Sequence, residues 1–484
     1  MIRIEVTLFA AAVLVLISIF ASRISLRFGI PALLLFLLVG MVAGSEGIGG
    51  VYYDDPYSAQ FIGTVALAFI LFSGGLDSQW ARLRPALVPS ILLSSVGVIL
   101  TAVLVGVFSH LVFGFTLTEG ILLGAIVSST DAAAVFSVLR GQKIRLYGSL
   151  EPILELESGS NDPMAILLTL GMIQVITVPS ITFLDLLIFF VQQFVLGALM
   201  GVASAFTLRW LLNRARLEVD GLYPVFMFAF VLLTYGLTAS IGGNGFLAVF
   251  LSGIILAQFE FRHKRSLISF HEGIAWLMQI TMFLALGLLV FPSQVLAQAD
   301  KGILIALFLI IVARPAAVFI SLIFLRIPWR QMLFVAWVGL RGAAPIILAT
   351  FPLLAGIALA AEIFNIVFFV VVTSVILQGL SLVWVARKLG LYIDAPPDVK
   401  SPLVFVQGDD MRGALHEIVV EANSGAVGRK ILELSLPPST LIVLIGRNNE
   451  FIVPNGGTDI LPGDRLLVLS DAQHLPALTT LCQC

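Results

Sequence analysis

The chain has 484 residues, of which 59% are hydrophobic and only 12% carry a charged side chain, and its mean hydropathy is +1.07. This composition excludes a soluble globular protein and predicts a chain that crosses a membrane many times. The formal net charge of −2 shows no excess of basic residues that would indicate nucleic-acid binding.

The N-terminal segment MIRIEVTLFAAAVLVLISIF carries one arginine and a long apolar run. It has no clear small-x-small cleavage site, so we interpret it as a first membrane helix and not as a removed signal peptide.

A hydropathy window of about 19 residues predicts thirteen membrane spans joined by short loops. Their centres lie near residues 15, 38, 68, 98, 129, 164, 198, 232, 252, 282, 314, 342 and 373. If the loops are assigned alternately to the two sides, one side has only Arg3 and Lys301. The other side collects Arg23, Arg27, Arg82, Arg84, Arg140, Lys143, Arg145, Arg209, Arg214, Arg216, Arg262, Lys264, Arg265, Arg326, Arg330, Arg387 and Lys388. Because basic loops remain in the cytoplasm, this predicts an external N-terminus and a cytoplasmic C-terminus.

Thirteen spans can be divided into two six-helix halves separated by one extra helix, which makes the halves inverted repeats. Many secondary transporters use such repeats, and their interrupted helices lie at matching positions. Span 5, ILLGAIVSSTDAAAVFSVL, has Ser128, Ser129, Thr130 and Asp131 at its centre. Span 12, LFVAWVGLRGAAPIILATF, is interrupted by Gly339, Arg341, Gly342 and Pro345. The two interruptions are seven spans apart, so they occupy equivalent places in the repeats.

Each interruption also has an ordinary explanation. Ser-Thr-Asp is a common helix N-cap, and GLRGAAP could be a kink whose small residues allow close helix packing. Matched interruptions that carry charges at membrane depth nevertheless favour a functional site. Two breaks that cross at the midplane would present helix ends and free carbonyl groups to an ion.

Span 6 contains the segment ESGSNDPMA, residues 157–165. Ser158, Asn161 and Asp162 lie on one helix face because residues three and four apart are neighbours. Pro163 lacks an N–H, so the carbonyl of Gly159 is expected to lose its helical partner. These are the hard oxygen ligands that alkali cations take, whereas no Cys or His cluster is present for a transition metal. A buried Asp162 can also hold a proton. A site that holds either a cation or a proton is what an exchanger needs.

The composition changes after Lys388. Residues 391–401 are predicted to be a linker, residues 402–475 a small cytoplasmic α/β domain, and residues 476–484 a tail. LHEIVVEA, STLIVLIGRN and the end of TDILPGDRLLVLSD are typical of strands, and SGAVGRKILEL predicts a turn followed by a helix. Cys482 and Cys484 are too few for a disulfide framework or a four-ligand metal site, so ordinary thiols are expected.

The motifs STDAAAVF, ESGSNDP, ARP and GLRGAAPI, in this order over residues 1–390, resemble the monovalent cation:proton antiporters of the NhaP-like branch. The segments VGRKILELSLP, LIGRN and DILPGDRLLVLSD resemble the TrkA-C half of the RCK regulatory module. The combination is similar to the potassium:proton antiporters of the cell-volume-regulation type. The resemblance implies an all-α polytopic membrane protein with thirteen helices, two crossed broken helices and inverted six-helix repeats, followed by the small domain.

The resemblance also implies roles for individual residues. Asp162 would be the carboxylate shared by the proton and the alkali cation, with Asn161, Ser158, Thr130 and Asp131 completing the site, some through the main chain or water. Glu157 would form a structural ion pair with Arg314. Arg341 would neutralise either half-helix C-termini or Asp131.

One position departs from the family pattern. In LFSGGLDSQW, related proteins often have an acidic residue where this chain has Ser73, and Asp77 follows one turn later. The cation preference therefore does not follow from the motifs alone.

The residues predict an inner-membrane cation:proton exchanger. The resemblance implies that it exchanges K⁺, or alternatively Na⁺ or Li⁺, for H⁺ by alternating access, with a role in pH homeostasis and cell volume. Asn161 cannot release a proton, so one proton per cation and electroneutral exchange are expected. The expected partners are the lipid bilayer, inorganic cations and a second copy of the chain. The expected functions do not include enzymatic catalysis or nucleic-acid binding.

Two other classes of protein remain open. An RCK-regulated cation channel would need a filter of the TVGYG type, which the sequence lacks, and a receptor or sensor would not need matched broken helices. Residues 389–484 contain no G-x-G-x-x-G motif, so the regulatory domain is expected to bind a smaller or nucleotide-type ligand and not NAD.

Overall fold

The structure is a computed structural model of the chain. It describes residues 4–28, 31–215, 217–394, 414–420, 424–434, 436–438, 440–447 and 450–470, together with Leu478 and Cys482. The chain forms two compact units, Met1–Ala395 and Pro396–Cys484, which are described separately.

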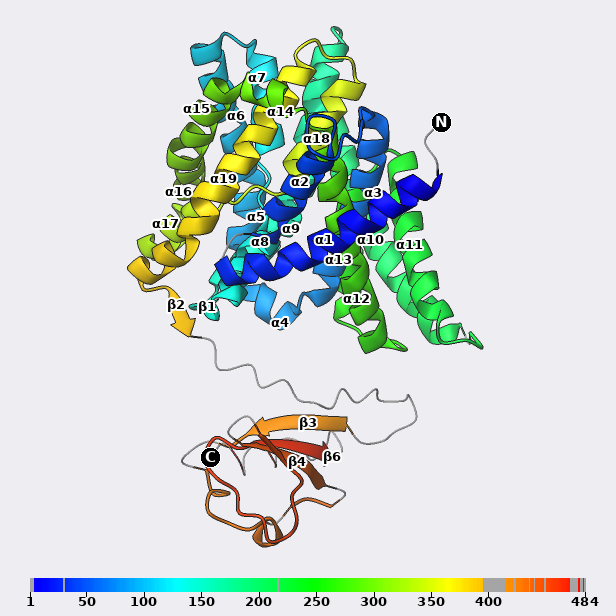
Figure 1. Cartoon of the computed structure of the whole chain (residues 1–484), viewed down its shortest axis with the longest axis vertical. Helices are drawn as coiled ribbons and strands as arrows, with labels where there is room; N and C mark the ends of the chain where they lie inside the picture. Colours follow the sequence, from blue (N-terminus) through cyan, green and yellow to red (C-terminus); the bar gives the residue numbers. More distant parts are fainter. Residues whose placement is uncertain are drawn as a thin grey trace. The chain divides into compact units, whose positions relative to one another are not determined.

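The first unit is helical (Figure 1). Its N-terminal half consists of α1 (Ile4–Phe28), α2 (Ala32–Ala43), α3 (Pro56–Asp77), α4 (Trp80–Leu83), η1 (Arg84–Ala86), α5 (Leu87–Leu92), η2 (Leu93–Gly97), α6 (Val98–Phe113), α7 (Leu117–Val127), α8 (Ala132–Gly141), α9 (Leu150–Thr177) and α10 (Phe183–Arg214). It continues with α11 (Leu222–Ser240), α12 (Gly245–Ala257), α13 (Lys264–Leu289), α14 (Pro292–Leu296), α15 (Ala299–Phe308), η3 (Leu309–Ala313), α16 (Arg314–Leu322), α17 (Trp329–Trp337), α18 (Ala343–Leu354) and α19 (Ala360–Leu389).

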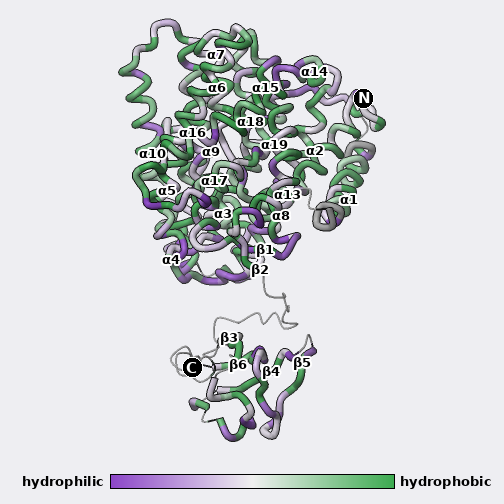
Figure 2. The backbone as a smooth tube through the Cα atoms, turned by 90° about the vertical axis from the view of Figure 1, so that its left-hand side faces the viewer, coloured by the Kyte–Doolittle hydropathy of each residue, from purple (hydrophilic) through white to green (hydrophobic). Residues whose placement is uncertain are grey.

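Within the described residues, eight helical stretches are long and apolar enough to cross a membrane, and four shorter apolar helices accompany them. Every predicted span centre falls in a helix or, near residues 129 and 342, in the gap between two helices. Helix α9 is not among the eight because its charged and amide side chains lower its hydropathy. Figure 2 shows a mostly hydrophobic tube for this unit, with hydrophilic stretches around α4, β1 and β2 and another beside α14.

The helices of this unit pack as two groups that stand side by side (Figure 1). In the α3–α13 group, α3 packs against α12 and α13, α13 packs against α2, and α12 packs against α10. In the α9–α19 group, α7 packs against α6 and α9, and α19 packs against α15 and α18. The two groups meet where α3 contacts α18 and where α9 contacts α12.

Two helices of the α9–α19 group contain a π-helical turn. The turns are η2 (Leu93–Gly97), between α5 and α6, and η3 (Leu309–Ala313), between α15 and α16. η2 packs against α16, and η3 packs against α6. π-Helical turns inside α-helices are frequent near functional sites, and η3 ends directly before Arg314.

The linker was predicted to begin at residue 391, but residues 392–394 belong to the membrane unit. Strand β2 (Tyr392–Asp394) pairs antiparallel with β1 (Ile144–Leu146), which lies between α8 and α9. The backbone N–H of Tyr147 also donates to the carbonyl of Leu391 over 3.1 Å. Residues 392–394 carry no local signal for this pairing, because their partner strand β1 lies about 250 residues earlier in the sequence.

The second unit contains an antiparallel sheet in the order β3–β6–β4–β5. Its strands are β3 (Ala414–Val419), β4 (Leu441–Arg447), β5 (Glu450–Ile452) and β6 (Arg465–Ser470). The strands predicted in LHEIVVEA, STLIVLIGRN and TDILPGDRLLVLSD correspond to β3, β4 and β6. Ile445, Leu466 and Val468 are in the core of this unit.

Two details of the second unit differ from the prediction. The segment 424–434 forms turns and a short 3₁₀ helix, η4 (Ile431–Glu433), and not an extended α-helix. Gly428 explains this difference, since it adopts a φ of 77° that interrupts a right-handed helix. In the predicted tail, Leu478 and Cys482 are buried in the core of the unit.

An ion pair between the partly exposed Arg447 and the buried Asp464 stabilises the end of β4 in the second unit. Arg447 donates from Nε to Asp464 Oδ1 over 2.8 Å and from Nη2 to Asp464 Oδ2 over 2.7 Å. These charge-assisted bonds raise the pKa of Arg447.

Candidate functional site

The first broken helix consists of α7 and α8. Helix α7 begins with a capping box between Thr116 and Glu119 and ends at Val127. Helix α8 begins after Asp131, whose side chain accepts a hydrogen bond from the N–H of Ala134 over 3.1 Å. Asp131 is therefore a helix N-cap, as the ordinary explanation of Ser-Thr-Asp predicted, and residues 128–131 still leave a non-helical gap inside the apolar unit.

The second broken helix consists of α17 and α18, and its gap crosses the first one. The N–H of Asp131 donates to the carbonyl of Leu340 over 2.8 Å. Gly342 lies directly against Asp131, because a Cβ added at Gly342 would be 2.2 Å from Asp131 Oδ2. Any larger residue would push the two gaps apart, so the contact requires glycine.

Arg341 extends from the second gap to the end of α7. Its Nη1 donates to the carbonyl of Ser128 over 3.0 Å and to that of Ser129 over 2.8 Å, and its side chain is buried. Of the two partners predicted for Arg341, the structure therefore shows the half-helix C-terminus. A guanidinium group at this place offsets the partial negative charge of the helix end.

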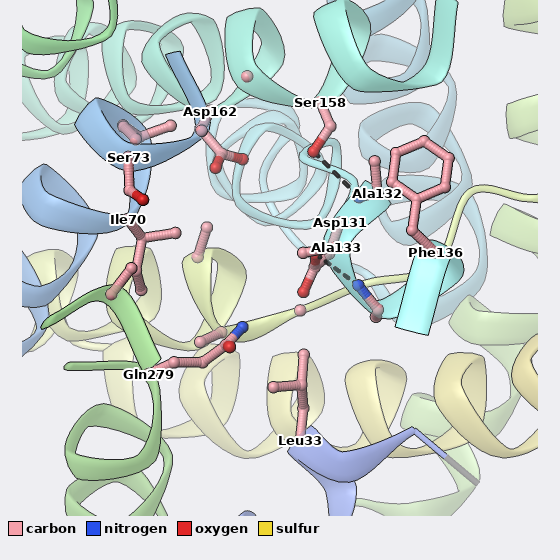
Figure 3. Close-up of a pocket in the computed structure, with 18 of the residues that line it drawn as sticks. Leu33, Ile70, Ser73, Asp131, Ala132, Ala133, Phe136, Ser158, Asp162 and Gln279 are labelled. Carbon is pink, nitrogen blue, oxygen red and sulfur yellow. Dashed lines mark hydrogen bonds between the residues drawn. The ribbon is translucent and has the colours of Figure 1, made fainter. Parts of the chain in front are cut away.

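Helix α9 binds the first gap through Ser158. Its hydroxyl donates to the carbonyl of Thr130 over 2.9 Å and accepts from the N–H of Ala132 over 3.0 Å. One side chain thus satisfies a backbone acceptor and a backbone donor on the two sides of Asp131, and Figure 3 shows the bond to Ala132. Water is scarce at membrane depth, so such groups need a protein partner.

Asp162 lies one turn further along α9 and faces a pocket of about 400 Å³ (Figure 3). Its Oδ1 accepts a hydrogen bond from the hydroxyl of Ser129. The α3–α13 group contributes Leu33, Ser73, Phe250 and Gln279 to the pocket, whereas the α9–α19 group contributes Ser129, Thr130, Asp131, Ser158 and Asp162. The pocket therefore lies between the two helix groups and combines the carboxylates of Asp131 and Asp162 with the side chains of Ser129, Thr130 and Ser158.

Asn161 does not line this pocket. It is fully buried behind it, and its Nδ2 donates to the hydroxyl of Thr130 over 2.5 Å. Its Oδ1 has no hydrogen-bond partner in the described part of the chain. The structure thus brings Ser158, Thr130, Asp131 and Asp162 together along the pocket. Asn161 lies behind them and contacts the Thr130 hydroxyl.

Glu157 and Arg314 form a pair beside the second gap. Arg314 Nη2 lies 2.6 Å from Glu157 Oε1, and the two side chains are 3% and 1% exposed, respectively. The Arg314 side chain also packs against Gly339, where an added Cβ would be 3.0 Å from its Nε. The pair links α9 to α16 and contacts the second gap.

The two ends of the pocket differ. Towards α4 it reaches Asp77 and Arg140, two exposed charged residues, together with Glu155 and Glu272. In the other direction α9 is closed off by α12. The buried Asn244 caps α12 and donates from Nδ2 to the carbonyl of Pro163 over 3.0 Å. The pocket lining on α9 ends at Asp162, so the pocket reaches Asp162 from the end that carries Asp77 and Arg140.

The comparisons with known proteins cover nearly the whole chain. The family described as sodium/hydrogen exchanger, transmembrane, matches residues 11–388, and the TrkA-C domain matches residues 415–483. The chain belongs to the sodium/hydrogen exchanger family. A protein named K(+)/H(+) antiporter NhaP, from Alkalimonas amylolytica, is 37% identical over 99% of this chain and 83% of its own length. The K(+)/H(+) antiporter NhaP2 of Shewanella sp. strain ANA-3 is 39% identical over 97% of this chain and 82% of its own length.

A more distant relative, the Na(+)/H(+) antiporter ApNhaP of Aphanothece halophytica, is 28% identical over 75% of this chain and 71% of its own length. The solved structure of the sodium proton antiporter MjNhaP1 from Methanocaldococcus jannaschii covers 80% of this chain and 99% of its own, with a TM-score of 0.70 and 22% identity. That likeness shows the fold. The chain therefore has the membrane fold and the domain combination of an NhaP-like exchanger with a TrkA-C domain.

Within this exchanger, Ser73 lies buried on α3 and lines the pocket, whereas Asp77 is exposed at its mouth. Ser129 contacts Asp162 directly, although no role was predicted for it from the sequence. Ser129 belongs to the SSTD segment of the first gap, so its position was visible. The orientation of its side chain towards α9 could not be predicted, because it depends on how the two gaps cross.

Removal of one member of the Glu157–Arg314 pair is expected to destabilise the protein. Glu157→Ala leaves an uncompensated guanidinium in an apolar interior, which costs roughly 3 to 5 kcal/mol. Less folded protein should be recovered, with a lower unfolding temperature in detergent. The double variant Glu157→Gln with Arg314→Gln, which removes both charges, should recover part of the loss. A Glu157→Ala protein of normal stability that is inactive would instead assign Glu157 to transport.

Proposed function

We propose that the protein is a secondary antiporter that exchanges K⁺ for H⁺ across the bacterial inner membrane. The observation that carries this proposal is Asp162, which lies in a one-sided pocket beside two crossed helix gaps. It accepts from a hydroxyl, and the described residues contain no salt bridge to it. A carboxylate without a fixed positive partner needs either a proton or a cation to neutralise it at this depth.

The oxygen atoms around the pocket fit an alkali cation. Thr130 and Asp131 lie on the first gap, Ser158 lies opposite them, and Ser129 contacts Asp162. Asn161 supports the site by holding the Thr130 hydroxyl, with its own oxygen available to an ordered water. Hydroxyl, carbonyl and carboxylate oxygens are the ligands that hard cations take. No group of three or more His, Cys, Asp or Glu residues suited to a resident metal occurs in the described ranges.

Potassium is favoured by two relatives, because proteins named K(+)/H(+) antiporter are 37% and 39% identical over nearly the full chain. Exchange of Na⁺ or Li⁺ for H⁺ is the alternative, since the relative from Aphanothece halophytica is named a Na(+)/H(+) antiporter. The buried Ser73 on α3 provides a hydroxyl where a carboxylate would add charge to the pocket, which weakens the field that favours small cations.

One proton is exchanged for each cation in this proposal. Asn161 offers no proton, Glu157 is paired with Arg314, and Asp131 caps α8. Asp162 is then the group that alternates between a bound proton and a bound cation. Each exchange cycle would move no net charge, so transport would be electroneutral.

Alternating access follows from the two helix groups. The pocket reaches Asp77 and Arg140 at one end, and beyond Asp162 Asn244 on α12 donates to the carbonyl of Pro163 on α9. Sliding of α9 relative to α12 would break that contact and expose Asp162 to the other side. The matching gaps in spans 5 and 12, together with the matching π-helical turns in spans 4 and 11, support two inverted six-helix repeats within thirteen crossings.

The basic loops support a cytoplasmic position for the mouth of the pocket, with an external N-terminus and a cytoplasmic C-terminus. The membrane unit would operate in the bilayer as a homodimer. An RCK-regulated channel remains the alternative of another class. A pocket that is closed at one end is what an antiporter needs and a conducting pore does not.

The TrkA-C domain would regulate exchange. It would bind a nucleotide-type or smaller ligand between two copies and shift the equilibrium between transport states by binding one state more tightly. The two compact units are consistent with a regulatory domain that is separate from the transport machinery.

Substitution of Asp162 by Asn tests whether this carboxylate binds the exchanged proton and cation. Asn is nearly isosteric and removes the site's titratable charge, so Asp162→Asn should reduce proton exchange in proteoliposomes to the level of empty liposomes without loss of folded protein. In the wild type, the apparent KM for K⁺ should rise as the pH falls, because a protonated carboxyl group does not bind the cation. Asp77→Asn, the same change at the pocket mouth, should retain exchange. Activity in Asp162→Asn would exclude Asp162 as the carrier.

Deletion of residues 402–484 tests whether the TrkA-C domain regulates exchange. The truncation leaves the whole first unit, including the β1–β2 pair. It should insert normally and still exchange K⁺ for H⁺, with an altered dependence on pH or on added nucleotide. A correctly inserted truncation that has lost all exchange would show that the TrkA-C domain is part of the transport machinery.

A further inference from the structure

Helix α19 contacts the second gap through polar side chains that the transport site does not use. Gln378 Nε2 donates to the carbonyl of Trp337, the last residue of α17, over 2.7 Å. Gln378 is 1% exposed, in a helix whose other buried residues are mostly apolar. A buried amide of this kind needs a specific set of partners to be tolerated.

Those partners continue to Arg341. Gln378 Oε1 accepts from the hydroxyl of Ser374 over 2.5 Å, and Ser374 Oγ accepts from the backbone N–H of Arg341 over 3.2 Å. Ser374 is also 1% exposed. The two side chains therefore bind both ends of the gap, at Trp337 and at Arg341, and hold its backbone between them.

Arg341 belongs to the same gap, and its guanidinium donates to the carbonyls of Ser128 and Ser129. Ser129 in turn donates to Asp162. Ser374 is thus linked to the carboxylate of Asp162 by consecutive direct hydrogen bonds, through Arg341 and Ser129. A displacement of the Arg341 backbone would be transmitted to the Ser129 hydroxyl.

We propose that Ser374 and Gln378 are positioning residues for the cation site. They hold Arg341 so that its guanidinium stays on the end of α7 and the Ser129 hydroxyl stays on Asp162. The inference rests on the proposed cation:proton exchange and adds two residues of α19 to it. Neither residue lines the pocket.

Loss of this network changes how the site binds cations. Supporting residues behind a metal-binding group typically change metal affinity by about tenfold or more when they are removed. Ser374→Ala and Gln378→Leu should therefore raise the apparent KM for K⁺ about tenfold, with a smaller effect on the maximal rate per folded protein. A purely structural role would lower the yield and the unfolding temperature and leave KM unchanged.

Ser381 provides the matched control. It lies on α19 one turn from Gln378 and contacts the same residue, Trp337, but through the indole Nε1 over 3.0 Å and not through the backbone of the gap. Ser381→Ala removes one hydroxyl, as Ser374→Ala does, and should leave KM unchanged. Ser374→Thr keeps the hydroxyl and should restore the wild-type KM.

The experiment measures K⁺-dependent proton flux in proteoliposomes made from the full-length variants, alongside their thermal unfolding in detergent. The expected result is a raised KM for Ser374→Ala and Gln378→Leu only. If Gln378→Leu does not fold, Ser374→Ala decides alone. A wild-type KM in folded Ser374→Ala, or an equal rise in Ser381→Ala, would overturn the inference. Absence of wild-type exchange with K⁺, Na⁺ and Li⁺ would instead refute the proposed function.

Discussion

The contact between Arg341 and the end of α7 is the interaction on which the site depends. Two helices are interrupted in an apolar interior, where each unpaired backbone group costs several kcal/mol. Arg341 satisfies the carbonyls of Ser128 and Ser129, and Asp131 N–H satisfies Leu340 O, so each gap supplies partners for the other. Neither gap would be stable alone at this depth. Their crossing also explains Gly342, since the gaps approach too closely for a Cβ.

The charges around the gaps divide into fixed and free ones. Arg341 lies against helix-end carbonyls, Glu157 is paired with Arg314, and Asp131 caps α8. Asp162 differs because its partner is the hydroxyl of Ser129, a neutral group. The architecture therefore assigns most of the buried charge near the gaps to holding the broken helices, and among these groups it leaves Asp162 without a charged or helix-end partner. That division is what our account of a single exchanged proton requires.

Much of this site could be predicted from sequence because its signals are local. A charge or a glycine in an apolar run marks a gap wherever the helices pack, and ESGSNDP places Asp162 and Ser158 on one helix face by periodicity alone. The pairing of Glu157 with Arg314 came from the family resemblance, and the structure brings the two side chains into contact.

The remaining features depend on long-range packing. Nothing near Ser129 shows that it faces Asp162, and nothing near Gln378 shows that it binds the end of α17, because both depend on which helices become neighbours. The same holds for β2, whose partner β1 lies between α8 and α9. The helix predicted in SGAVGRKILEL was wrong for a local reason, since the left-handed conformation of Gly428 ends any regular helix there.

The central claim is that Asp162 alternates between one proton and one cation. The most direct test is the ratio of K⁺ to H⁺ flux in proteoliposomes under an imposed membrane potential. Each net charge moved across the membrane is worth about 2.3 kcal/mol per 100 mV, so an electrogenic cycle would respond strongly. Our account predicts a flux ratio of one and a rate that does not change with voltage. A rate that follows the voltage, or more than one proton per cation, would contradict it.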